Sequence, residues 1–311
     1  GSTGSIGRQT LEVVRAFPQR FQVVALTGGR NLTLLKAQVR EFKPKLVSTE
    51  SGARGERMPG ASHLSMEEIA AHPDVELVVV ATAGKAGLGP TLAAIRAGKT
   101  IALANKEVLV MAGEIVAAEA KRQGVEILPI DSEHSAIWQC LRGEDRKDIA
   151  RLILTASGGP FRGRTIKQLA GVTPEEALRH PTWQMGTKVT IDSATLMNKG
   201  MEIIEAHWLF GVPFGQIEVV IHHQSIIHSM VEFVDGSIKA QLSLPDMRLP
   251  IQYAMTYPER WEGAFRSRVD FGKTGSLNFE AVDLDRFPCL RIAREAAEEG
   301  GTYPAVLCAA D

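Results

Sequence analysis

The strongest constraint on this chain is a series of short apolar runs that alternate with helical patterns over its first 130 residues. The runs occupy residues 21–26, 77–82, 100–104 and 125–130, and segments of helical periodicity such as 91–97 lie between them. Strands that are apolar on both faces and alternate with helices are typical of a parallel, doubly wound sheet. We therefore predict an α/β, Rossmann-like domain over residues 1–130.

The pattern changes from about residue 150 onward. Segments 152–155, 218–221, 226–234 and 237–244 have strand character, whereas residues 193–210 have helical periodicity. Asp235-Gly236 joins the last two strands as a hairpin turn, because glycine tolerates a positive φ. We predict an α+β catalytic domain with a mostly antiparallel sheet over residues 131–254. Residues 255–311 are expected to connect it to the start of a helical domain, and residues 51–60 to form a surface loop.

The charge balance and the cysteines exclude several classes of protein. The chain has 35 basic and 36 acidic side chains, which argues against a broad surface for nucleic acid or anionic membrane. Its three cysteines, Cys140, Cys289 and Cys308, are scattered and form neither a disulfide framework nor a zinc pattern. Apolar runs all fall short of the roughly 20 residues that span a bilayer. We expect a cytoplasmic protein without nucleic-acid or membrane partners.

A glycine-rich turn opens the sequence. Gly1, Gly4 and Gly7 are spaced as G-x-x-G-x-x-G ahead of an amphipathic helix, which is a variant of the dinucleotide-binding fingerprint. The N–H groups and the dipole of that helix start would suit a pyrophosphate, although a purely structural turn has the same composition.

The segment after the first predicted strand bears on the choice of cofactor. It reads Gly28-Gly29-Arg30-Asn31 and contains no carboxylate for the ribose hydroxyls of NADH. Arg30 could hold the 2′-phosphate of NADPH, or be a surface arginine ahead of a helix. Residues 83–87, which follow the predicted strand 77–82, also contain small residues that would let a cofactor approach.

Three carboxylates indicate a cation site. If residues 131–133 are extended, Asp131 and Glu133 project to the same side and can share a hard cation such as Mg²⁺ or Mn²⁺. The alternative is an ordinary polar helix start, and the tetrapeptide alone favours it. Glu202 adds a third carboxylate, on one helical face with Asn198 and Lys199. The alternative there is a surface Lys–Glu pair, and we expect Glu205 to form a salt bridge or to support the ligands from behind.

Other polar groups suit a phosphate. Ser157, Ser193, Asn198 and Lys199 can hold phosphate oxygens through charge-assisted hydrogen bonds. Trp183 can cover a substrate and exclude water. Taken singly, these residues have ordinary explanations: a histidine before proline, such as His180, often sits in a turn, and a tryptophan often sits in a core.

The motifs, in this order, resemble the 1-deoxy-D-xylulose 5-phosphate reductoisomerase family. The matching segments are GSTGSIG at 1–7, AGKTIALANKE at 97–107, LPIDSEH at 128–134, SGGPFR at 157–162, HPTWQMG at 180–186, IDSATLMNKGMEIIEA at 191–206, HHQSIIHSMVEF at 222–233 and LPDMR at 244–248. They extend along essentially the whole chain, and together they are far more specific than a generic dinucleotide-binding match.

The resemblance implies a role for each matching position. It makes Asp131, Glu133 and Glu202 ligands of Mg²⁺ or Mn²⁺, and Lys106 and Glu133 catalytic. It places the substrate against Ser132, Ser157, His180, Trp183, Met185, Ser193, Asn198 and Lys199, with Trp183 and Met185 on a closing flap. It places NADPH against Thr3, Gly4, Ser5, Ile6, Gly29, Arg30, Asn31, Asn105, Glu107, Gly186 and Met247. Ser225, His228 and Pro245 match positions around the active site.

The reaction implied by the resemblance is a rearrangement followed by a reduction. 1-Deoxy-D-xylulose 5-phosphate is rearranged to a branched aldehyde, and hydride from NADPH then gives 2-C-methyl-D-erythritol 4-phosphate, a precursor of isoprenoids. A homodimer in bacterial cytosol, rather than plastid stroma, is expected. The resemblance also implies a first strand before Gly1 and a helical domain beyond Asp311, so we expect this chain to be part of a longer protein. Two alternatives stay open: a metal-independent, two-domain NADP-dependent dehydrogenase, and an inactive cofactor-binding fragment.

Overall fold

The computed structural model describes residues 1–49, 58, 60–263, 265 and 268–311, so most of the predicted loop 51–60 lies outside the described residues. The chain forms two compact units. Unit 1 comprises Gly1–Val108, Ala112–Asp131 and Met247–Phe265, and unit 2 comprises Leu109–Met111, Ser132–Asp246 and Arg266–Asp311. The three domain ranges predicted from the sequence remain predictions.

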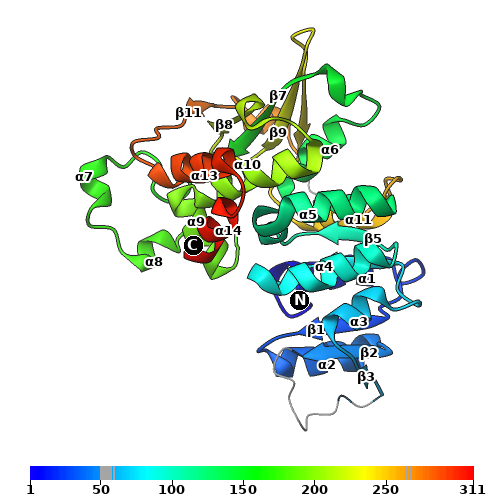
Figure 1. Ribbon diagram of the computed structural model, residues 1–311. Helices are drawn as coiled ribbons and strands as arrows, with labels where there is room; N and C mark the ends of the chain where they lie inside the picture. The colour runs from blue at the N-terminus through cyan, green and yellow to red at the C-terminus, as the bar shows by residue number, and fades with distance from the viewer. Residues whose placement is uncertain (50–57, 59, 264, 266–267) are drawn as a thin grey trace. The chain divides into compact units, whose positions relative to one another are not determined.

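Unit 1 is an α/β unit built on parallel strands (Figure 1). One sheet has the order β1-β2-β3, and the other the order β4-β5-β6. The strands are β1 (Ala25–Gly28), β2 (Leu46–Thr49), β3 (Ser62–His63), β4 (Leu77–Val80), β5 (Thr100–Leu103) and β6 (Ile127–Pro129). The helices are α1 (Ser5–Ala16), α2 (Leu32–Phe42), α3 (Met66–Ala71), α4 (Leu88–Arg96), α5 (Glu107–Gln123) and α11 (Arg248–Thr256), with a 3₁₀ turn η1 (Gly84–Gly87). The alternation of parallel strands with helices confirms the predicted fold class.

The first predicted strand is displaced in the structure. The sequence pattern predicted residues 21–26, but β1 begins at Ala25 and ends at Gly28. Phe21 instead joins an aromatic cluster, with ring centroids 6.3 Å from Phe17 and 5.5 Å from Trp261. Aromatic packing with residues more than 200 positions away therefore overrides the local strand pattern.

Unit 2 contains a mixed sheet of order β10-β9-β7-β8-β11. Its strands are β7 (Ile149–Ala156), β8 (Ile217–Ile221), β9 (Ile227–Phe233), β10 (Ile238–Leu242) and β11 (Glu280–Ala281). Among the described residues, β7 pairs with β8 in parallel, and the other three pairings are antiparallel. The predicted mostly antiparallel sheet is confirmed. Gly236 takes the expected positive φ of 83° in the hairpin turn.

Helices α6 (Ser132–Cys140), α9 (Thr187–Thr195), α10 (Met197–Phe210), α13 (Pro288–Glu299) and α14 (Tyr303–Ala310) complete the main frame of unit 2 (Figure 1). Shorter helices are α7 (Ile166–Leu169), α8 (Pro174–Ala177) and α12 (Phe271–Thr274), with 3₁₀ turns η2 (Arg146–Asp148) and η3 (Phe214–Gln216). The predicted continuous helix 193–210 is wrong. It breaks at Leu196, whose left-handed φ of 61° ends α9 and starts α10.

Helix α10 is buried on several sides. Ile203, Ala206 and Phe210 belong to the core that includes the sheet, whereas Met201 and Ile204 pack in a second cluster with α13. The crossing of α10 and α13 is close, because a Cβ on Gly200 would lie 2.4 Å from Cβ of Ala293. This packing holds the polar residues of α10 in fixed positions inside the unit.

The structure also bears on membrane insertion. Across the parts of the chain that the structure describes, none of the helices combines the length and apolarity needed to cross a bilayer.

Candidate active site

Three carboxylates converge at the start of α6 and on α10. One oxygen each of Asp131, Glu133 and Glu202 lies within 4.8 Å of the others. Asp131 directly precedes α6, Glu133 lies in the first turn of α6, and Glu202 lies on α10. Carboxylate oxygens are the ligands that Mg²⁺ and Mn²⁺ prefer, so this donor set fits a hard divalent cation.

The local conformation differs from the one assumed for Asp131 and Glu133. Residues 131–133 are not an extended segment, because α6 begins at Ser132. Asp131 just before the helix and Glu133 in its first turn favour helix initiation. The hydroxyl of Ser132 donates to Oε2 of Glu133 over 2.6 Å. The predicted cluster still forms, and it depends on α10 bringing Glu202 to the start of α6.

Lysine side chains neutralise these carboxylates. Nζ of Lys106 lies 2.6 Å from Oδ2 of Asp131. Nζ of Lys199 lies 2.7 Å from Oε1 of Glu133 and 2.5 Å from Oε2 of Glu202. It also donates to the Thr155 carbonyl over 2.6 Å. The alternative of a surface Lys–Glu pair is therefore wrong, because the side chains of Lys199 and Glu202 are 4% and 0% exposed.

The charge state of Lys199 follows from these contacts. Burial alone lowers its pKa, but attraction to Glu133 and Glu202 outweighs that effect and raises the pKa above its ordinary value. The side chain is therefore a buried ammonium ion. On the same helix, the amide of Asn198 donates to Oε1 of Glu202 over 2.5 Å.

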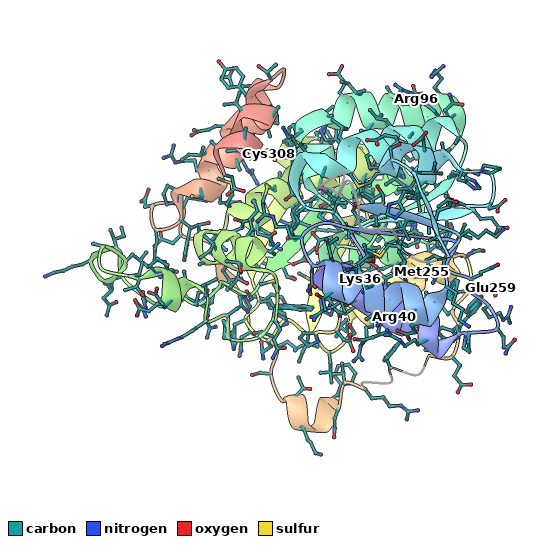
Figure 2. The ribbon with its side chains drawn as sticks, turned by 90° about the horizontal axis from the view of Figure 1, so that it is seen from below. Lys36, Arg40, Arg96, Met255, Glu259 and Cys308 are labelled. Carbon is teal, nitrogen blue, oxygen red and sulfur yellow. The ribbon has the colours of Figure 1, made fainter. Side chains whose placement is uncertain are left out.

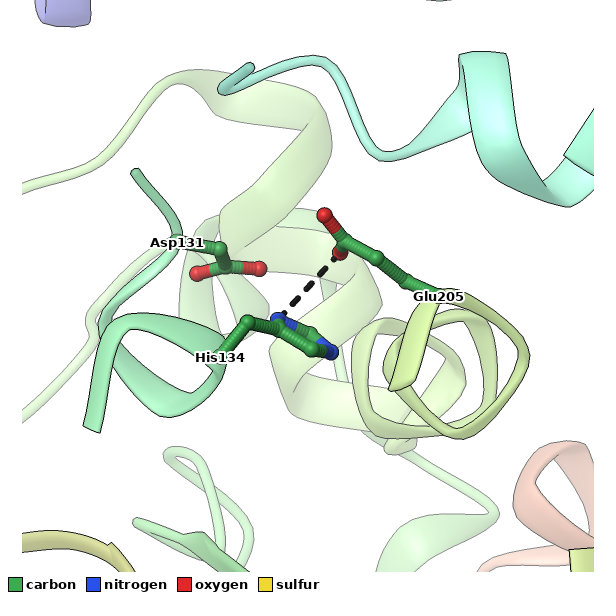
Figure 3. Close-up of side chains that lie close together, drawn as sticks. All are labelled: Asp131, His134 and Glu205. Carbon is green, nitrogen blue, oxygen red and sulfur yellow. Dashed lines mark ion pairs between the residues drawn. The ribbon is translucent and has the colours of Figure 1, made fainter. Parts of the chain in front are cut away.

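A second cluster shares Asp131 with the first (Figure 3). Oε2 of Glu205 lies 3.4 Å from Nδ1 of His134, and both side chains are completely buried. Nε2 of His134 lies 2.9 Å from the Glu202 carbonyl, which only accepts, so Nε2 donates. Glu205 therefore contacts a histidine next to the predicted ligands, and its role in a salt bridge or as support for the ligands stays a prediction. Through His134, Glu205 is linked to the backbone of Glu202.

Ser157 and His180 form a hydrogen-bonded pair at the predicted phosphate site. Nδ1 of His180 accepts from the backbone N–H groups of Thr182 and Trp183, at 3.1 and 2.9 Å. Nε2 therefore carries the hydrogen and donates to Oγ of Ser157 over 2.9 Å. Burial lowers the pKa of His180, which favours this neutral form. Because Oγ of Ser157 also accepts from the N–H of Gly159 over 3.2 Å, its own hydrogen is directed toward a further acceptor.

Ser193 lies next to this loop. A Cβ on Gly159 would come within 2.6 Å of the Ser193 carbonyl, so only glycine permits this approach. Phe161, Ala177 and Ala194 pack together beneath it and connect the loop to α8 and α9. The structure thus brings the Ser157 loop and the last turn of α9 together.

The remaining predicted residues of unit 2 occupy the surrounding loops. The Trp183 and His228 rings lie 6.0 Å apart, and His228 is buried against Ser243. Gly186 is the N-cap of α9, whereas Met185 and Pro245 are partly exposed. Ser225 adopts a left-handed φ of 51°.

Four of the predicted cofactor residues lie at the start of α1: Thr3, Gly4, Ser5 and Ile6. Gly1 and Gly7 are required by packing, because a Cβ on either would lie 2.2 Å from a carbonyl oxygen. Gly4 is different: a Cβ there would meet nothing closer than 3.4 Å. Gly4 is the N-cap of α1, which has neither a side-chain cap nor an acidic residue in its first turn. The N–H groups of Ser5 and Ile6 therefore belong to a helix start that suits an anion.

Arg30 follows Gly29 at the carboxyl end of β1, and its side chain is exposed. Asn31 is the N-cap of α2, where its Oδ1 accepts from the N–H of Leu34 over 3.0 Å. Two further cations, Lys36 and Arg40, follow on α2 (Figure 2). Arg30 precedes this helix, so the alternative of a surface arginine stays open.

Asn105 has a clear structural role. Its amide group donates to the carbonyls of Thr82 and Gly84, at 2.9 and 3.0 Å. Its Oδ1 accepts from the N–H of Val108 over 3.2 Å. Asn105 thereby joins the loop after β4 to the start of α5, which contains Glu107. Thr3 is partly buried in the glycine turn, and Met247 is the N-cap of α11.

Two contacts at this site had no clear signal in the sequence. His134 belongs to the matching segment LPIDSEH, yet only the fold shows that it reaches Glu205 and the Glu202 backbone. The carbonyl of Thr155 is a backbone atom and carries no residue-type signal at all. For His134, the one available signal was its position directly after Glu133, a candidate cation ligand.

Comparison with known proteins agrees with the geometry. The sequence matches the family "1-deoxy-D-xylulose 5-phosphate reductoisomerase" over residues 1–113, and C-terminal domains of the same enzyme family over residues 127–210 and 242–311. It is 56% identical to the 1-deoxy-D-xylulose 5-phosphate reductoisomerase of Heliobacterium modesticaldum and 55% identical to that of Pelotomaculum thermopropionicum. These alignments cover all of this chain and 82% and 83% of the relatives.

Solved structures give the same result. One is a DOX-P reductoisomerase in complex with NADPH, fosmidomycin and magnesium, with a TM-score of 0.91 and 46% identity over 96% of this chain and 78% of that one. Another is the Zymomonas mobilis enzyme in complex with NADPH, with a TM-score of 0.91 and 42% identity over 98% of this chain and 82% of that one. The chain belongs to the 1-deoxy-D-xylulose 5-phosphate reductoisomerase family.

Proposed function

We propose that this protein converts 1-deoxy-D-xylulose 5-phosphate to 2-C-methyl-D-erythritol 4-phosphate, with NADPH as the reductant and Mg²⁺ or Mn²⁺ as the cation. The observation that carries the proposal is the convergence of Asp131, Glu133 and Glu202 within 4.8 Å. A simple dehydrogenase needs no such cluster. Magnesium and NADPH both accompany a solved relative that is 46% identical to this chain.

Asp131, Glu133 and Glu202 are the residues that would hold the cation. When bound, the cation supplies Lewis-acid stabilisation of the negative charge that develops on neighbouring substrate oxygens. Lys106, 2.6 Å from Asp131, is suited to donate a hydrogen bond to the reacting part of the substrate. Ser132 orients Glu133 through its hydroxyl.

The phosphate of the substrate is proposed to bind Ser157, Ser193, Asn198 and Lys199, with His180 behind Ser157. The hydrogen-bond pattern supports this, because His180 and Gly159 both donate to Ser157 and direct its hydroxyl hydrogen outward. The phosphate is remote from the bonds that break, so its binding energy can position the reacting carbons. Trp183 and Met185 are proposed to cover the bound substrate, which would exclude water.

The cofactor is proposed to bind residues of unit 1, together with Gly186 of unit 2. Thr3, Gly4, Ser5 and Ile6 would hold the pyrophosphate at the start of α1, and Arg30 beside Gly29 and Asn31 would hold the 2′-phosphate. Asn105, Glu107, Gly186 and Met247 are proposed at the nicotinamide end, with Asn105 acting through the loop that it fixes. Bound NADPH supplies the hydride that reduces the rearranged aldehyde.

The state of the protein in the cell is also a proposal. We propose a homodimer in the bacterial cytosol, with a phosphosugar as its small-molecule substrate. The domain ranges 1–130, 131–254 and 255–311 are proposed with it. Size-exclusion chromatography with light scattering tests the dimer, and a monomer at micromolar concentration would exclude it.

The function is tested by assaying the purified protein with NADPH, 1-deoxy-D-xylulose 5-phosphate and Mn²⁺. Consumption of NADPH together with formation of 2-C-methyl-D-erythritol 4-phosphate is the expected result. The Glu133→Gln protein should lose most of this turnover while still binding NADPH. Near-normal turnover of that variant would exclude the proposed role of Glu133.

A further inference from the structure

The positively charged ammonium group of Lys199 lies among the carboxylates that are predicted to bind the divalent cation. Nζ of Lys199 contacts Oε1 of Glu133 and Oε2 of Glu202 at 2.7 and 2.5 Å. Its third contact is the Thr155 carbonyl, at 2.6 Å. An ammonium group has three donors, so these three acceptors use its whole donor capacity. In this arrangement Lys199 has no N–H left for a phosphate.

The arrangement sets two cations in competition. The oxygens that Lys199 contacts belong to the carboxylates that would hold the divalent cation. Two positive charges that share buried carboxylates repel each other strongly, because the protein interior screens charge poorly. A divalent cation that binds Glu133 and Glu202 therefore favours departure of the ammonium group.

The candidate phosphate site begins two residues along the chain from a group that Lys199 already contacts. Thr155, whose carbonyl Lys199 already contacts, lies two residues before Ser157. The lysine stem has four flexible carbons, so the ammonium can move while the Lys199 backbone stays within α10. At the new position the ammonium group and the Ser157 hydroxyl, which is already held by His180, would both donate to the phosphate.

We propose that Lys199 couples the two sites: it bridges Glu133 and Glu202 when no divalent cation is bound, and it is released to the substrate phosphate when the cation binds. This inference rests on the proposed function, and it gives a reason why the divalent cation would favour binding of the substrate phosphate. Because coupling between two ligands is reciprocal, phosphate must strengthen cation binding by the same factor as the cation strengthens phosphate binding.

Calorimetry with the full chain tests the competition. Mn²⁺ is titrated into the wild-type protein and into Lys199→Met, without phosphate or cofactor. Removal of the competing ammonium should tighten Mn²⁺ binding about tenfold or more, because the cation no longer displaces a buried ion pair. Lys188→Met is the matched control, since Lys188 pairs with Asp192 and with Asp311 and contacts neither glutamate. Unchanged or weaker binding in a folded Lys199→Met protein overturns the proposal.

A second measurement needs no variant, and so it can overturn the proposal even if Lys199→Met fails to fold. Inorganic phosphate is titrated into the wild-type protein with and without saturating Mg²⁺. The expected result is a several-fold gain in phosphate affinity with Mg²⁺, together with an equal gain in Mg²⁺ affinity with phosphate. Equal phosphate affinity in both titrations overturns the proposal. In a folded Lys199→Met protein the gain in phosphate affinity on adding Mg²⁺ should be smaller, because only the direct attraction between Mg²⁺ and phosphate remains.

Failure of this inference can be told apart from failure of the proposed function. Turnover of 1-deoxy-D-xylulose 5-phosphate by the wild-type protein reports on the function alone. If the protein turns over the substrate but cation and phosphate binding are not coupled, only the role of Lys199 is refuted. If the two are coupled but there is no turnover, the proposed reaction is refuted and a cation-dependent phosphate site remains.

Discussion

Lys199 and Glu202 form an ion pair within one turn of α10, with Nζ 2.5 Å from Oε2, and both side chains are buried. A buried ion pair adds little stability over apolar residues of the same size, because both ions lose their water. Buried, charged groups with perturbed pKa values are more often found at functional sites. The pair therefore agrees with the proposal that the polar face of α10 serves binding and catalysis rather than folding.

Loss of a cation ligand should abolish turnover without unfolding the protein. Glu202→Gln replaces a carboxylate oxygen by an amide, and we expect kcat/KM to fall about 100-fold or more, since cation stabilisation is worth several kcal/mol. NADPH affinity should stay unchanged. Glu218→Gln is the control, because Glu218 makes only a partly exposed salt bridge with Arg151. Equal activities of Glu202→Gln and its control would refute the cation role.

Arg30 should determine the preference between cofactors. Arg30→Ala removes one charge-assisted contact to the 2′-phosphate, which is worth about 1.5–3 kcal/mol, so KM for NADPH should rise about tenfold or more. KM for NADH should hardly change. Arg40→Ala is the matched control, because Arg40 is also an arginine but lies in the last turn of α2 (Figure 2). Steady-state kinetics with both cofactors decide, and an equal change for NADPH and NADH would leave Arg30 without this role.

Buried His228 should make the protein less stable in acid. Burial lowers its pKa from 6.5 to about 4, with smaller contributions from His222 and Lys199 that lower it and from the Ser243 backbone that raises it. The unfolded chain therefore takes up this proton first as the pH falls. Stability is present above pH 6.5 and is lost progressively between pH 6.5 and about 4, by about 3 kcal/mol in total.

His228→Gln tests this directly, because glutamine keeps an N–H donor for Ser243 but does not titrate. Denaturant unfolding at several pH values should show a smaller loss of stability for the variant between pH 6.5 and 4. Above pH 7 the two proteins should respond to pH in parallel. Identical pH profiles throughout would show that His228 is not buried in its neutral form.

The crossing of α10 and α13 should not tolerate a larger residue at Gly200. In Gly200→Ala the added methyl group meets Cβ of Ala293 at 2.4 Å, and we expect a loss of about 1–3 kcal/mol. Gly215→Ala is the control, because nothing lies within 4 Å of a Cβ there. Adding Ala293→Gly should restore part of the loss. Chemical unfolding measures all three, and a stable single variant without rescue would contradict this packing.

The sequence predicted the fold class because apolar patterning is local, and it predicted through its motifs that Asp131, Glu133 and Glu202 come together. It did not predict the backbone conformation at Glu133, since a helix start and an extended segment were both compatible with residues 131–134. The break at Leu196 could not be anticipated either, because leucine gives no signal for a positive φ. Contacts such as Lys199 with Glu133 join residues 66 positions apart, so only the assembled fold reveals them.

The most direct test of the central claim is the cation dependence of NADPH oxidation by the purified wild-type chain with 1-deoxy-D-xylulose 5-phosphate. We predict no oxidation after chelation, full recovery on adding Mn²⁺ or Mg²⁺, and one 2-C-methyl-D-erythritol 4-phosphate formed for each NADPH consumed. Oxidation that persists after chelation, or that yields a different product, would contradict the account.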